Sequence, residues 1–272
     1  MNIKGKTALV LGAVKGIGKA IGLALADNGA NLVLTRHDWE DFFEDMEKDF
    51  NASKARHIIC DVDLLDPGEI SSLINKIEKK FGCIDILVNN IERGGWPVVH
   101  GKYTKNQWDL EMATTLRAKR WVFDAALPLL KKSEDAIVIN FSSIAAITGR
   151  TGPAALVFND GYAAANRGVS LLTETWARMG APLIRVNEIM LGIFETRHGP
   201  GTRGWEQVLT PDEKNALINH IPMGRIGKTD DIVKTVLFII RDAPYMTGSV
   251  IKLDGGYTIG GENVPQMPKG VL

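Results

Sequence analysis

The sequence has no excess of either charge, since its 272 residues include 32 basic and 32 acidic side chains. Sequence-independent binding to a nucleic acid or to an anionic membrane surface needs a basic excess, so we expect neither as a partner. Long apolar runs are also missing, because Lys, Asp or Asn interrupts each one well before the roughly 18–20 residues of a membrane helix. We therefore expect a soluble, cytoplasmic protein.

Cysteine is scarce as well, with only Cys60 and Cys83 in the chain. Two cysteines do not make a disulfide framework for a chain of this size, and neither lies in a Cys-x-x-Cys pair typical of metal sites. The segment from Met1 to Lys6 shows no charged region followed by a long apolar stretch and a cleavage site, so no leader is expected. These absences favour a reducing, intracellular setting and no metal.

Short runs of Val, Ile and Leu alternate along the chain with segments of helical period. The runs are apolar at consecutive positions, which is typical of parallel strands buried on both faces. Strands are predicted at residues 7–11, 31–35, 56–60, 84–88, 136–141, 184–189 and 249–253, and helices at 16–28, 39–51, 67–81, 105–130, 161–179 and 230–241. The alternation predicts an α/β fold of the doubly wound (Rossmann) type, a seven-stranded parallel sheet with helices on both faces.

No linker rich in Pro, Gly or Ser divides the chain, and no internal repeat is present. A single domain over residues 1–260 is therefore predicted, followed by a C-terminal tail at 261–272. Residues 194–221 stand outside the alternation and carry several Gly and Pro. Long insertions in compact α/β domains are commonly lids or binding loops, so this segment is the predicted substrate lid.

Three glycines, Gly12, Gly16 and Gly18, follow the first predicted strand and open the first predicted helix, with Ile17 between the last two. Glycine allows backbone conformations closed to other residues and lets a pyrophosphate approach the main chain. A helix N-terminus adds unpaired N–H groups and a partial positive charge. A tight strand-to-helix turn is the alternative explanation, but the position favours dinucleotide binding.

The spacing Gly-x-x-x-Gly-x-Gly after Leu11 resembles the short-chain dehydrogenase/reductase (SDR) family. Further matches are Asn89-Asn90, Ser143 in the fifth predicted strand, Tyr162, Arg185-Val186-Asn187, and the segments 221–225 and 247–257. The resemblance covers about residues 4–258. It implies hydride transfer between a nicotinamide and a carbonyl or alcohol carbon. Tyr162 would be the acid or base, Ser143 would polarise the substrate oxygen, and Asn89 would lie beside the cofactor.

The cofactor choice depends on the end of the second predicted strand, where an acidic residue binds the ribose 2′-hydroxyl and Arg accommodates a 2′-phosphate. Arg36 stands there, and Lys15 resembles the second basic position of NADP-preferring members. We predict NADP(H) over NAD(H), although Asp38 weakens the positive field. Asp61 and Val62 resemble the family's pair at the adenine edge.

The active-site pattern departs from the family at two positions. The resemblance implies a Lys four residues after the Tyr, which lowers the Tyr pKa and binds the nicotinamide ribose, and an Asn in the preceding helix. This chain has Asn166 and Thr115 there, and an amide carries no charge. Lys119 lies one turn beyond Thr115 and could reach inward, but a lysine on a helix is usually solvated, and that is what we expect here. Arg167 is rotated by about 100° from Asn166 and is a doubtful substitute.

Two segments are expected to shape the substrate pocket. The interval between Ser143 and Tyr162 is longer than in the family, so residues 152–160 should form an extra wall. In the lid, Arg197, His198 and Arg203 can clamp a carboxylate or phosphate while Trp205 stacks on a planar group, which implies an anionic small-molecule substrate. A loop whose charges face water is the alternative.

The sequence thus leaves three functional hypotheses. Retention of Ser143 and Tyr162 favours an atypical NADP(H)-dependent oxidoreductase. Loss of the Lys and Asn favours a catalytically silent dinucleotide-binding protein, a sensor or partner subunit. A lyase or isomerase on the same scaffold is the third. By resemblance, helices 105–130 and 161–179 form a homodimer or homotetramer, with Trp121, Phe123 and Trp176 as apolar anchors.

Overall fold

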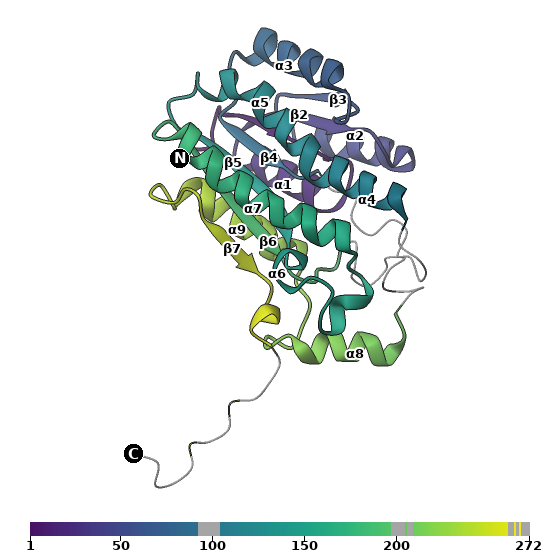
Figure 1. Cartoon of the computed structure of the whole chain (residues 1–272). Helices are drawn as coiled ribbons and strands as arrows, with labels where there is room; N and C mark the ends of the chain where they lie inside the picture. Colours follow the sequence, from purple (N-terminus) through teal and green to yellow (C-terminus); the bar gives the residue numbers. More distant parts are fainter. Residues whose placement is uncertain (92–103, 197–204, 206–208, 261–263, 265–266, 268–272) are drawn as a thin grey trace.

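The computed structural model describes residues 1–91, 104–196, 205, 209–260, 264 and 267. Its centre is a seven-stranded parallel sheet in the order β3-β2-β1-β4-β5-β6-β7 (Figure 1). The strands are β1 (Thr7–Val10), β2 (Asn31–Arg36), β3 (His57–Asp61), β4 (Ile86–Asn89), β5 (Ala136–Ser143), β6 (Ile184–Leu191) and β7 (Val250–Leu253). The chain builds outward from β1 to β3 and then returns to start β4 beside β1, so the order reverses between β1 and β4. In open α/β sheets ligands bind at such a reversal, outside the carboxyl ends of the strands.

Helices cover both faces of the sheet, as the alternation predicts. One face carries α1 (Gly16–Asp27), α2 (Phe43–Ala52) and α9 (Thr229–Arg241), and the other carries α3 (Pro67–Phe81), α5 (Ala118–Leu130) and α7 (Asp160–Gly180). Shorter helices are α4 (Lys105–Glu111), α6 (Ala145–Thr148) and α8 (Pro211–His220). A π-helical stretch, Met112–Arg117, joins α4 to α5. Among the described residues there are also 3-10 turns at Glu40–Phe42, Pro153–Leu156 and Tyr257–Ile259.

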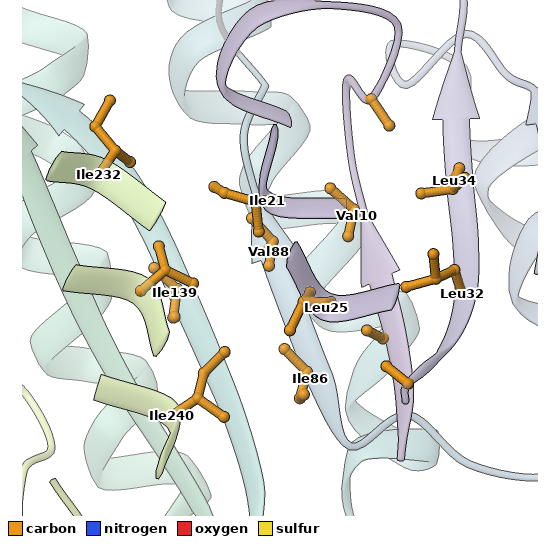
Figure 2. Packing of buried hydrophobic residues seen from close by; sticks show 14 of the residues in the cluster. Val10, Ile21, Leu25, Leu32, Leu34, Ile86, Val88, Ile139, Ile232 and Ile240 are labelled. Carbon is orange, nitrogen blue, oxygen red and sulfur yellow. The ribbon is translucent and has the colours of Figure 1, made fainter. Parts of the chain in front are cut away.

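The apolar runs of β1 to β6 are continuous because each of these strands contributes side chains to two cores, one on either face of the sheet. In β4, Ile86 and Val88 pack toward α1 and α9, whereas Leu87 packs toward α3 and α5. Figure 2 shows the first of these cores, where side chains of the sheet meet Ile21 and Leu25 of α1. The doubly wound prediction is confirmed by this arrangement.

The largest differences between the structure and the predicted elements lie at residues 105–130 and at α8. Residues 105–130 were expected as one regular helix, and they contain the π-helical stretch. Helix α8 was not predicted within the lid segment, although its start carries a clear signal. Thr210 caps it, Pro211 occupies its first turn, and Thr210 and Glu213 form a reciprocal capping box.

The expectation that Phe123 and Trp176 anchor an interface between subunits is wrong. Both side chains are fully buried inside one chain, where their rings stack with centroids 4.2 Å apart and an interplanar angle of 6°. They lie between α5 and α7, so these helices are apolar on more than one face because they pack on each other as well as on the sheet. Trp121 is half-buried against the same core.

No helix among the described residues is long and apolar enough to cross a membrane. Nor do these residues contain a group of three or more His, Cys, Asp and Glu side chains that could hold a metal ion.

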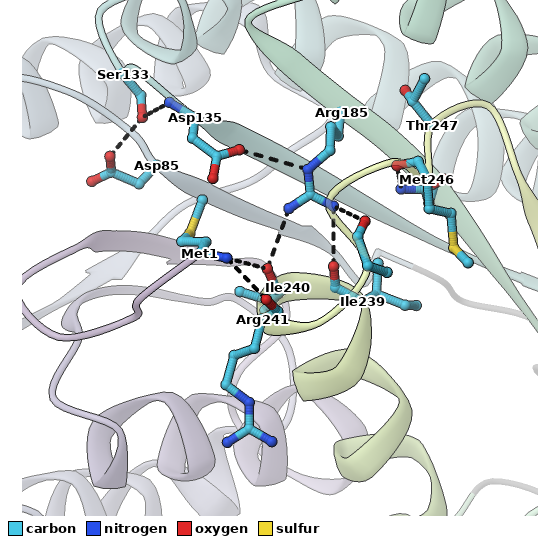
Figure 3. A network of polar contacts seen from close by, with 12 residues as sticks. Met1, Asp85, Ser133, Asp135, Arg185, Ile239, Ile240, Arg241, Met246 and Thr247 are labelled. Atoms are coloured by element: carbon cyan, nitrogen blue, oxygen red, sulfur yellow. Dashed lines mark hydrogen bonds and ion pairs between the residues drawn. The ribbon is translucent and has the colours of Figure 1, made fainter.

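The amino end of the sheet, where the strands begin, is closed by buried charges with several partners each (Figure 3). Asp85 accepts hydrogen bonds from Ser133 Oγ at 2.6 Å, from Thr7 N at 2.8 Å and from Lys6 Nζ at 3.2 Å. Burial by itself would raise the pKa of Asp85, but the bonds from Ser133 and Thr7 and the Lys6 ammonium hold that pKa below its ordinary value.

Arg185, near the start of β6, closes the neighbouring part of the same end. Its guanidinium donates to Ile239 O at 3.1 Å, to Ala243 O at 3.0 Å and to Ile240 O at 3.2 Å, all at the C-terminus of α9. Its Nε lies 3.6 Å from Asp135 Oδ1. The carbonyl groups at the end of α9 thus accept hydrogen bonds from a buried cation. A positive charge at the C-terminus of a helix also interacts favourably with the helix dipole.

Candidate functional site

The glycine turn lies at the carboxyl end of the sheet, between β1 and α1. Gly12 has a φ of +64°, and a Cβ there would lie 2.7 Å from Asn90 O. A Cβ on Gly18 would lie 2.2 Å from Gly12 O. Gly12 N donates to Thr35 Oγ1 at 3.0 Å, and Asn90 Nδ2 donates to Gly12 O at 3.4 Å. Only glycine fits these positions, and Asn90, which sequence reasoning missed, ties the turn to the end of β4.

The start of α1 fits a dinucleotide. Lys15 is its N-cap, with extended backbone and no capping side chain, and Gly16 follows with a φ of +57° and open space around it. The first N–H groups of α1, including those of Ile17 and Gly18, therefore have no side-chain acceptor at the helix end, which is the arrangement that binds a pyrophosphate. The predicted cofactor contacts of this turn stay predictions, and its geometry suits them.

At the predicted adenosine end, Arg36 is the last residue of β2 and is engaged by two carboxylates. Its Nη1 donates to Glu47 Oε1 at 2.7 Å, and its Nε lies 3.7 Å from Asp61 Oδ2. The guanidinium carbon is 4.2 Å from the centre of the Phe43 ring. Asp61 ends β3, and Val62 N donates to Arg36 O at 2.9 Å. The structure thus brings the predicted cofactor residues Arg36, Asp61 and Val62 together.

Lys15, the second predicted phosphate ligand, points at an aromatic segment that follows β2. Its Nζ lies 3.3 Å from the centre of the Trp39 ring and 4.6 Å from that of Phe42. These are cation–π distances. Trp39 holds a left-handed backbone conformation with a φ of 74°. Both basic side chains of the predicted 2′-phosphate site are therefore held by protein groups.

Tyr162 lies in the first turn of α7, and its position is fixed by a chain of contacts from α4. Its N donates to Oδ1 of the N-cap Asn159 at 2.7 Å, and Asn159 Nδ2 donates to Glu111 Oε1 at 3.2 Å. Glu111 is 2% exposed, and Tyr162 is 5% exposed. Sequence reasoning missed both positioning residues, although an Asn three residues before the Tyr is a recognisable helix-capping signal.

Ser143 ends β5 and is also buried. Its Oγ accepts a hydrogen bond from Ala145 N at 3.2 Å. Ile144, which follows it, belongs to the same apolar cluster as Tyr162 and Trp205. The structure therefore brings the predicted catalytic pair and Trp205 to one region. Arg197, His198 and Arg203 lie outside the described residues.

The insertion at residues 152–160 contributes to this apolar cluster. Ala154, Val157 and Phe158 are buried in it, and the Phe158 and Tyr162 rings lie 5.9 Å apart. Ala154 N donates to Tyr257 Oη at 2.8 Å, which ties the insertion to the turn after β7. Residues of the insertion thus lie beside Tyr162, and their role as a wall of the substrate pocket stays a prediction.

Asn166 and Thr115 occupy the two positions that depart from the family pattern, and both are fully buried. Asn166 Nδ2 donates to Tyr162 O at 3.0 Å. Its Oδ1 and the Thr115 Oγ1 have no hydrogen-bond partner among the described residues. Helix α7 passes close to the π-helical stretch here, since a Cβ on Gly168 would lie 2.9 Å from Leu116 Cδ1.

The expectation that Lys119 is solvated is wrong, because its side chain is fully buried. Its Nζ donates to Thr115 O at 3.0 Å and to Ile91 O. A π-turn takes up more residues than an α-turn, so the side chains beyond it are rotated about the helix axis relative to an uninterrupted α-helix. The π-helical stretch just before Lys119 explains why a regular helical period does not predict its direction.

Beneath α7 lies a buried polar layer. Asn89 Nδ2 donates to Asn140 Oδ1 at 3.1 Å, and Asn140 Nδ2 donates to Thr173 Oγ1 at 2.9 Å. The side chain of Asn89 is therefore directed into this layer, and its predicted cofactor contact stays a prediction.

Glu188 of β6 belongs to the same layer and is fully buried. Its Oε1 accepts from Ser142 Oγ and, at 3.0 Å, from Ser170 Oγ. Burial raises the pKa of Glu188, against those two hydrogen bonds and the positive charges of Lys119 and Arg167. A carboxyl with a raised pKa thus lies in the layer that also holds Lys119.

Comparison with known proteins decides the family. The sequence model of a family described as enoyl-(acyl carrier protein) reductase matches residues 12–258. The chain belongs to the short-chain dehydrogenase/reductase family. Family members are oxidoreductases that bind NAD(P), and the seven-stranded parallel sheet is the SDR fold.

Relatives of this SDR extend over nearly the whole chain. The 3-oxoacyl-(acyl-carrier-protein) reductase FabG of Thermotoga maritima is 30% identical, over 95% of this chain and all of the relative. The enzyme of that name from Vibrio cholerae is 30% identical, over 94% of this chain and 98% of its own. A blue fluorescent protein from a metagenomic library, solved in complex with NADPH, is 25% identical, with a TM-score of 0.80, over 94% of this chain and 99% of its own.

Proposed function

We propose that this SDR is an NADP(H)-dependent oxidoreductase that interconverts a carbonyl and an alcohol, with 3-oxoacyl thioesters as the first substrate class to test. The carrying observation is the placement of Tyr162, buried in the first turn of α7 and fixed through Asn159 by Glu111. The thioester class comes from the relatives that are named 3-oxoacyl-(acyl-carrier-protein) reductases.

The reaction divides between the cofactor and two side chains. When bound, the nicotinamide supplies or accepts the hydride. In the reductive direction, the Ser143 hydroxyl donates a hydrogen bond to the carbonyl oxygen, and Tyr162 gives its phenolic proton to that oxygen as the alcohol forms. The apolar cluster around Tyr162 keeps water away from the reacting carbon.

NADP(H) is the proposed cofactor because two basic side chains lie at the expected 2′-phosphate position. Arg36 and Lys15 approach it from β2 and from the start of α1. Their present partners, Glu47 and the Trp39 ring, are themselves exposed, so a phosphate can replace them at small cost. The relative solved with NADPH supports the same choice.

The decisive experiment is single-turnover reduction of acetoacetyl thioesters and a panel of ketones with NADPH. Tyr162→Phe should slow the reaction by about 10²–10⁴-fold, the usual contribution of a positioned acid. Tyr257→Phe is the matched control, because it removes another buried tyrosine hydroxyl from the same cluster, one that accepts a hydrogen bond from Ala154 N. Equal rates for Tyr162→Phe and the unaltered protein would refute the proposal.

A catalytically silent dinucleotide-binding protein is the second candidate, and Asn166 is the observation that favours it. The residue four positions after Tyr162 is fully buried but uncharged. This candidate predicts NADPH binding in a fluorescence titration, with no substrate of the panel reduced and no difference between the unaltered protein and Tyr162→Phe.

We also propose a homodimer or homotetramer, since α7 and α9 still present large apolar side chains to solvent. Leu171 on α7 is 66% exposed, and Phe238 on α9 is 48% exposed. Light scattering at micromolar concentration tests this directly, and Leu171→Glu should lower the measured mass if that face is an interface.

A further inference from the structure

A buried ammonium group lies between α5 and the end of β4. Lys119 donates to Ile91 O, and Ile91 directly follows Asn90, whose amide donates to Gly12 O. The ammonium is thus anchored two residues beyond the end of β4, next to the strand that meets the glycine turn. This is the side of the β1/β4 reversal along which a dinucleotide crosses the sheet.

Helix α7 brings Tyr162 and Asn166 toward the same elements. Gly168 allows α7 to approach Leu116 in the π-helical stretch that ends just before α5. Thr115 lies in that stretch, and its carbonyl oxygen accepts a hydrogen bond from the Lys119 ammonium. Asn166 is fully buried on α7, and its Nδ2 donates a hydrogen bond to Tyr162 O. Position 166 thus carries no charge, while a buried ammonium lies on the helix that follows the π-helical stretch, the segment that α7 approaches at Gly168.

We propose that Lys119 takes over the electrostatic role of the lysine that this SDR lacks four residues after Tyr162, its ammonium stabilising the phenolate that forms when Tyr162 gives up its proton. The inference rests on the proposed function. The phenolic proton goes to the substrate oxygen, the hydride goes from the reduced nicotinamide to the carbon, and the phenolate takes a proton from solvent to complete the cycle. Lys119 keeps its protons throughout and acts as a positioning residue through its charge.

Other charged groups around Tyr162 do not replace this contribution. Glu111 from α4 and Asp160 on α7 carry negative charge, which opposes formation of a phenolate. Glu188 from β6 has a raised pKa, which reduces its own negative charge. Arg167 on α7 lines a groove together with Leu171 and Glu174, and the carboxyl whose pKa its positive charge lowers is that of Glu188.

The test titrates Tyr162 in the full chain without cofactor, by tyrosinate ultraviolet absorbance, with Tyr162→Phe subtracted. Tyr162 should ionise below the ordinary tyrosine pKa of about 10, and Lys119→Met should raise its midpoint by about 1 unit or more. Lys119→Arg, which keeps the charge, should retain the low midpoint. Lys234→Met is the control, since Lys234 is an exposed lysine paired with Asp230.

The most discriminating variant restores the family's lysine at position 166. Asn166→Lys in the Lys119→Met background should return the midpoint toward that of the unaltered protein, which a merely structural role of Lys119 does not predict. A midpoint unchanged by Lys119→Met would overturn the proposal. If Lys119→Met fails to fold, the unaltered protein decides alone, because a Tyr162 midpoint at or above about 10 also overturns it.

The titration separates this inference from the proposed function, because it needs neither cofactor nor turnover. A lowered midpoint that depends on Lys119, in a protein that reduces no substrate, would support the inference and count against the function. Reduction that depends on Tyr162, with a Tyr162 midpoint that is independent of Lys119, would support the proposed function and contradict the inference.

Discussion

At the amino end of the sheet, Asp85 and Arg185 are buried charges with protein partners on several sides. At the carboxyl end and beneath α7, Thr115, Asn166 and Glu188 each keep a buried polar atom with no hydrogen-bond partner among the described residues. At the amino end Arg185 Nε is also without a hydrogen bond among them, but it lies 3.6 Å from the Asp135 carboxylate. An unsatisfied buried polar group costs about 1–3 kcal/mol and is retained mainly where function requires it. One end of the sheet is thus arranged for stability, and the other accepts a stability cost beside its candidate site.

The largest effect that tests this comparison is expected at Asp85. Asp85→Asn should lower the free energy of unfolding by about 2–3 kcal/mol, because a carboxylate that accepts from Ser133, Thr7 and Lys6 becomes a neutral amide. Since the folded pKa of Asp85 is depressed, its contribution is present above the ordinary value of 3.8 and is lost as the pH falls below it. Urea unfolding at neutral and acid pH measures both effects.

Asp135→Asn is the control for that experiment. Asp135 is half exposed and lies 3.6 Å from Arg185, so its loss should cost less than about 1 kcal/mol. Equal costs for the two substitutions, or a loss of NADPH binding in Asp85→Asn, would break the comparison between the two ends.

Glu188→Gln should produce the opposite pH dependence. The raised pKa of Glu188 means that its contribution to stability is present below the ordinary value of 4.5 and is lost as the pH rises through the folded pKa. The variant should therefore gain stability relative to the unaltered protein between acid and neutral pH, by up to about 1.4 kcal/mol for each unit of the shift. Urea unfolding across this range checks it, with the half-exposed Glu174→Gln on α7 expected to show no such gain.

Much of the fold could be predicted from the sequence because its signals are local. Asp66 and Pro67 mark the start of α3, whose predicted and observed bounds agree. Consecutive apolar residues mark the buried parallel strands. The burial of Lys119 could not be predicted, since a π-turn leaves no mark in a helical period. The partner of Arg36 was equally hidden, because sequence order does not show that Glu47 of α2 lies opposite the end of β2.

Glu47→Gln tests the carboxyl end with a smaller effect. Releasing Arg36 from an exposed ion pair should lower the Kd for NADPH about 2–5-fold and leave that for NADH unchanged, as expected for a pair worth under about 1 kcal/mol. Fluorescence titration of both cofactors measures the ratio. Glu44→Gln, an exposed carboxylate on the same helix, should leave both affinities unaltered.

Arg36→Asp should shift the cofactor preference from NADPH toward NADH in the same titration. An unchanged ratio of the two affinities would contradict the NADP(H) assignment.

The smallest effect is expected at Thr115. Thr115→Val should not lower the free energy of unfolding and should raise it by up to about 1 kcal/mol, because it removes a buried hydroxyl that has no described partner. Thr173→Val is its matched control, since Thr173 is equally buried but accepts from Asn140 Nδ2 at 2.9 Å, and its loss should cost about 1–2 kcal/mol. Chemical denaturation of both variants sharpens the comparison, and a larger cost at Thr115 would contradict it.

The contact between Lys15 and Trp39 has an optical consequence. An ammonium 3.3 Å from the centre of an indole ring perturbs its excited state, and this indole is 48% exposed. If a 2′-phosphate draws Lys15 away, the emission of Trp39 should change with NADPH and much less with NADH. The chain thus carries its own spectroscopic probe of the phosphate that separates the two cofactors.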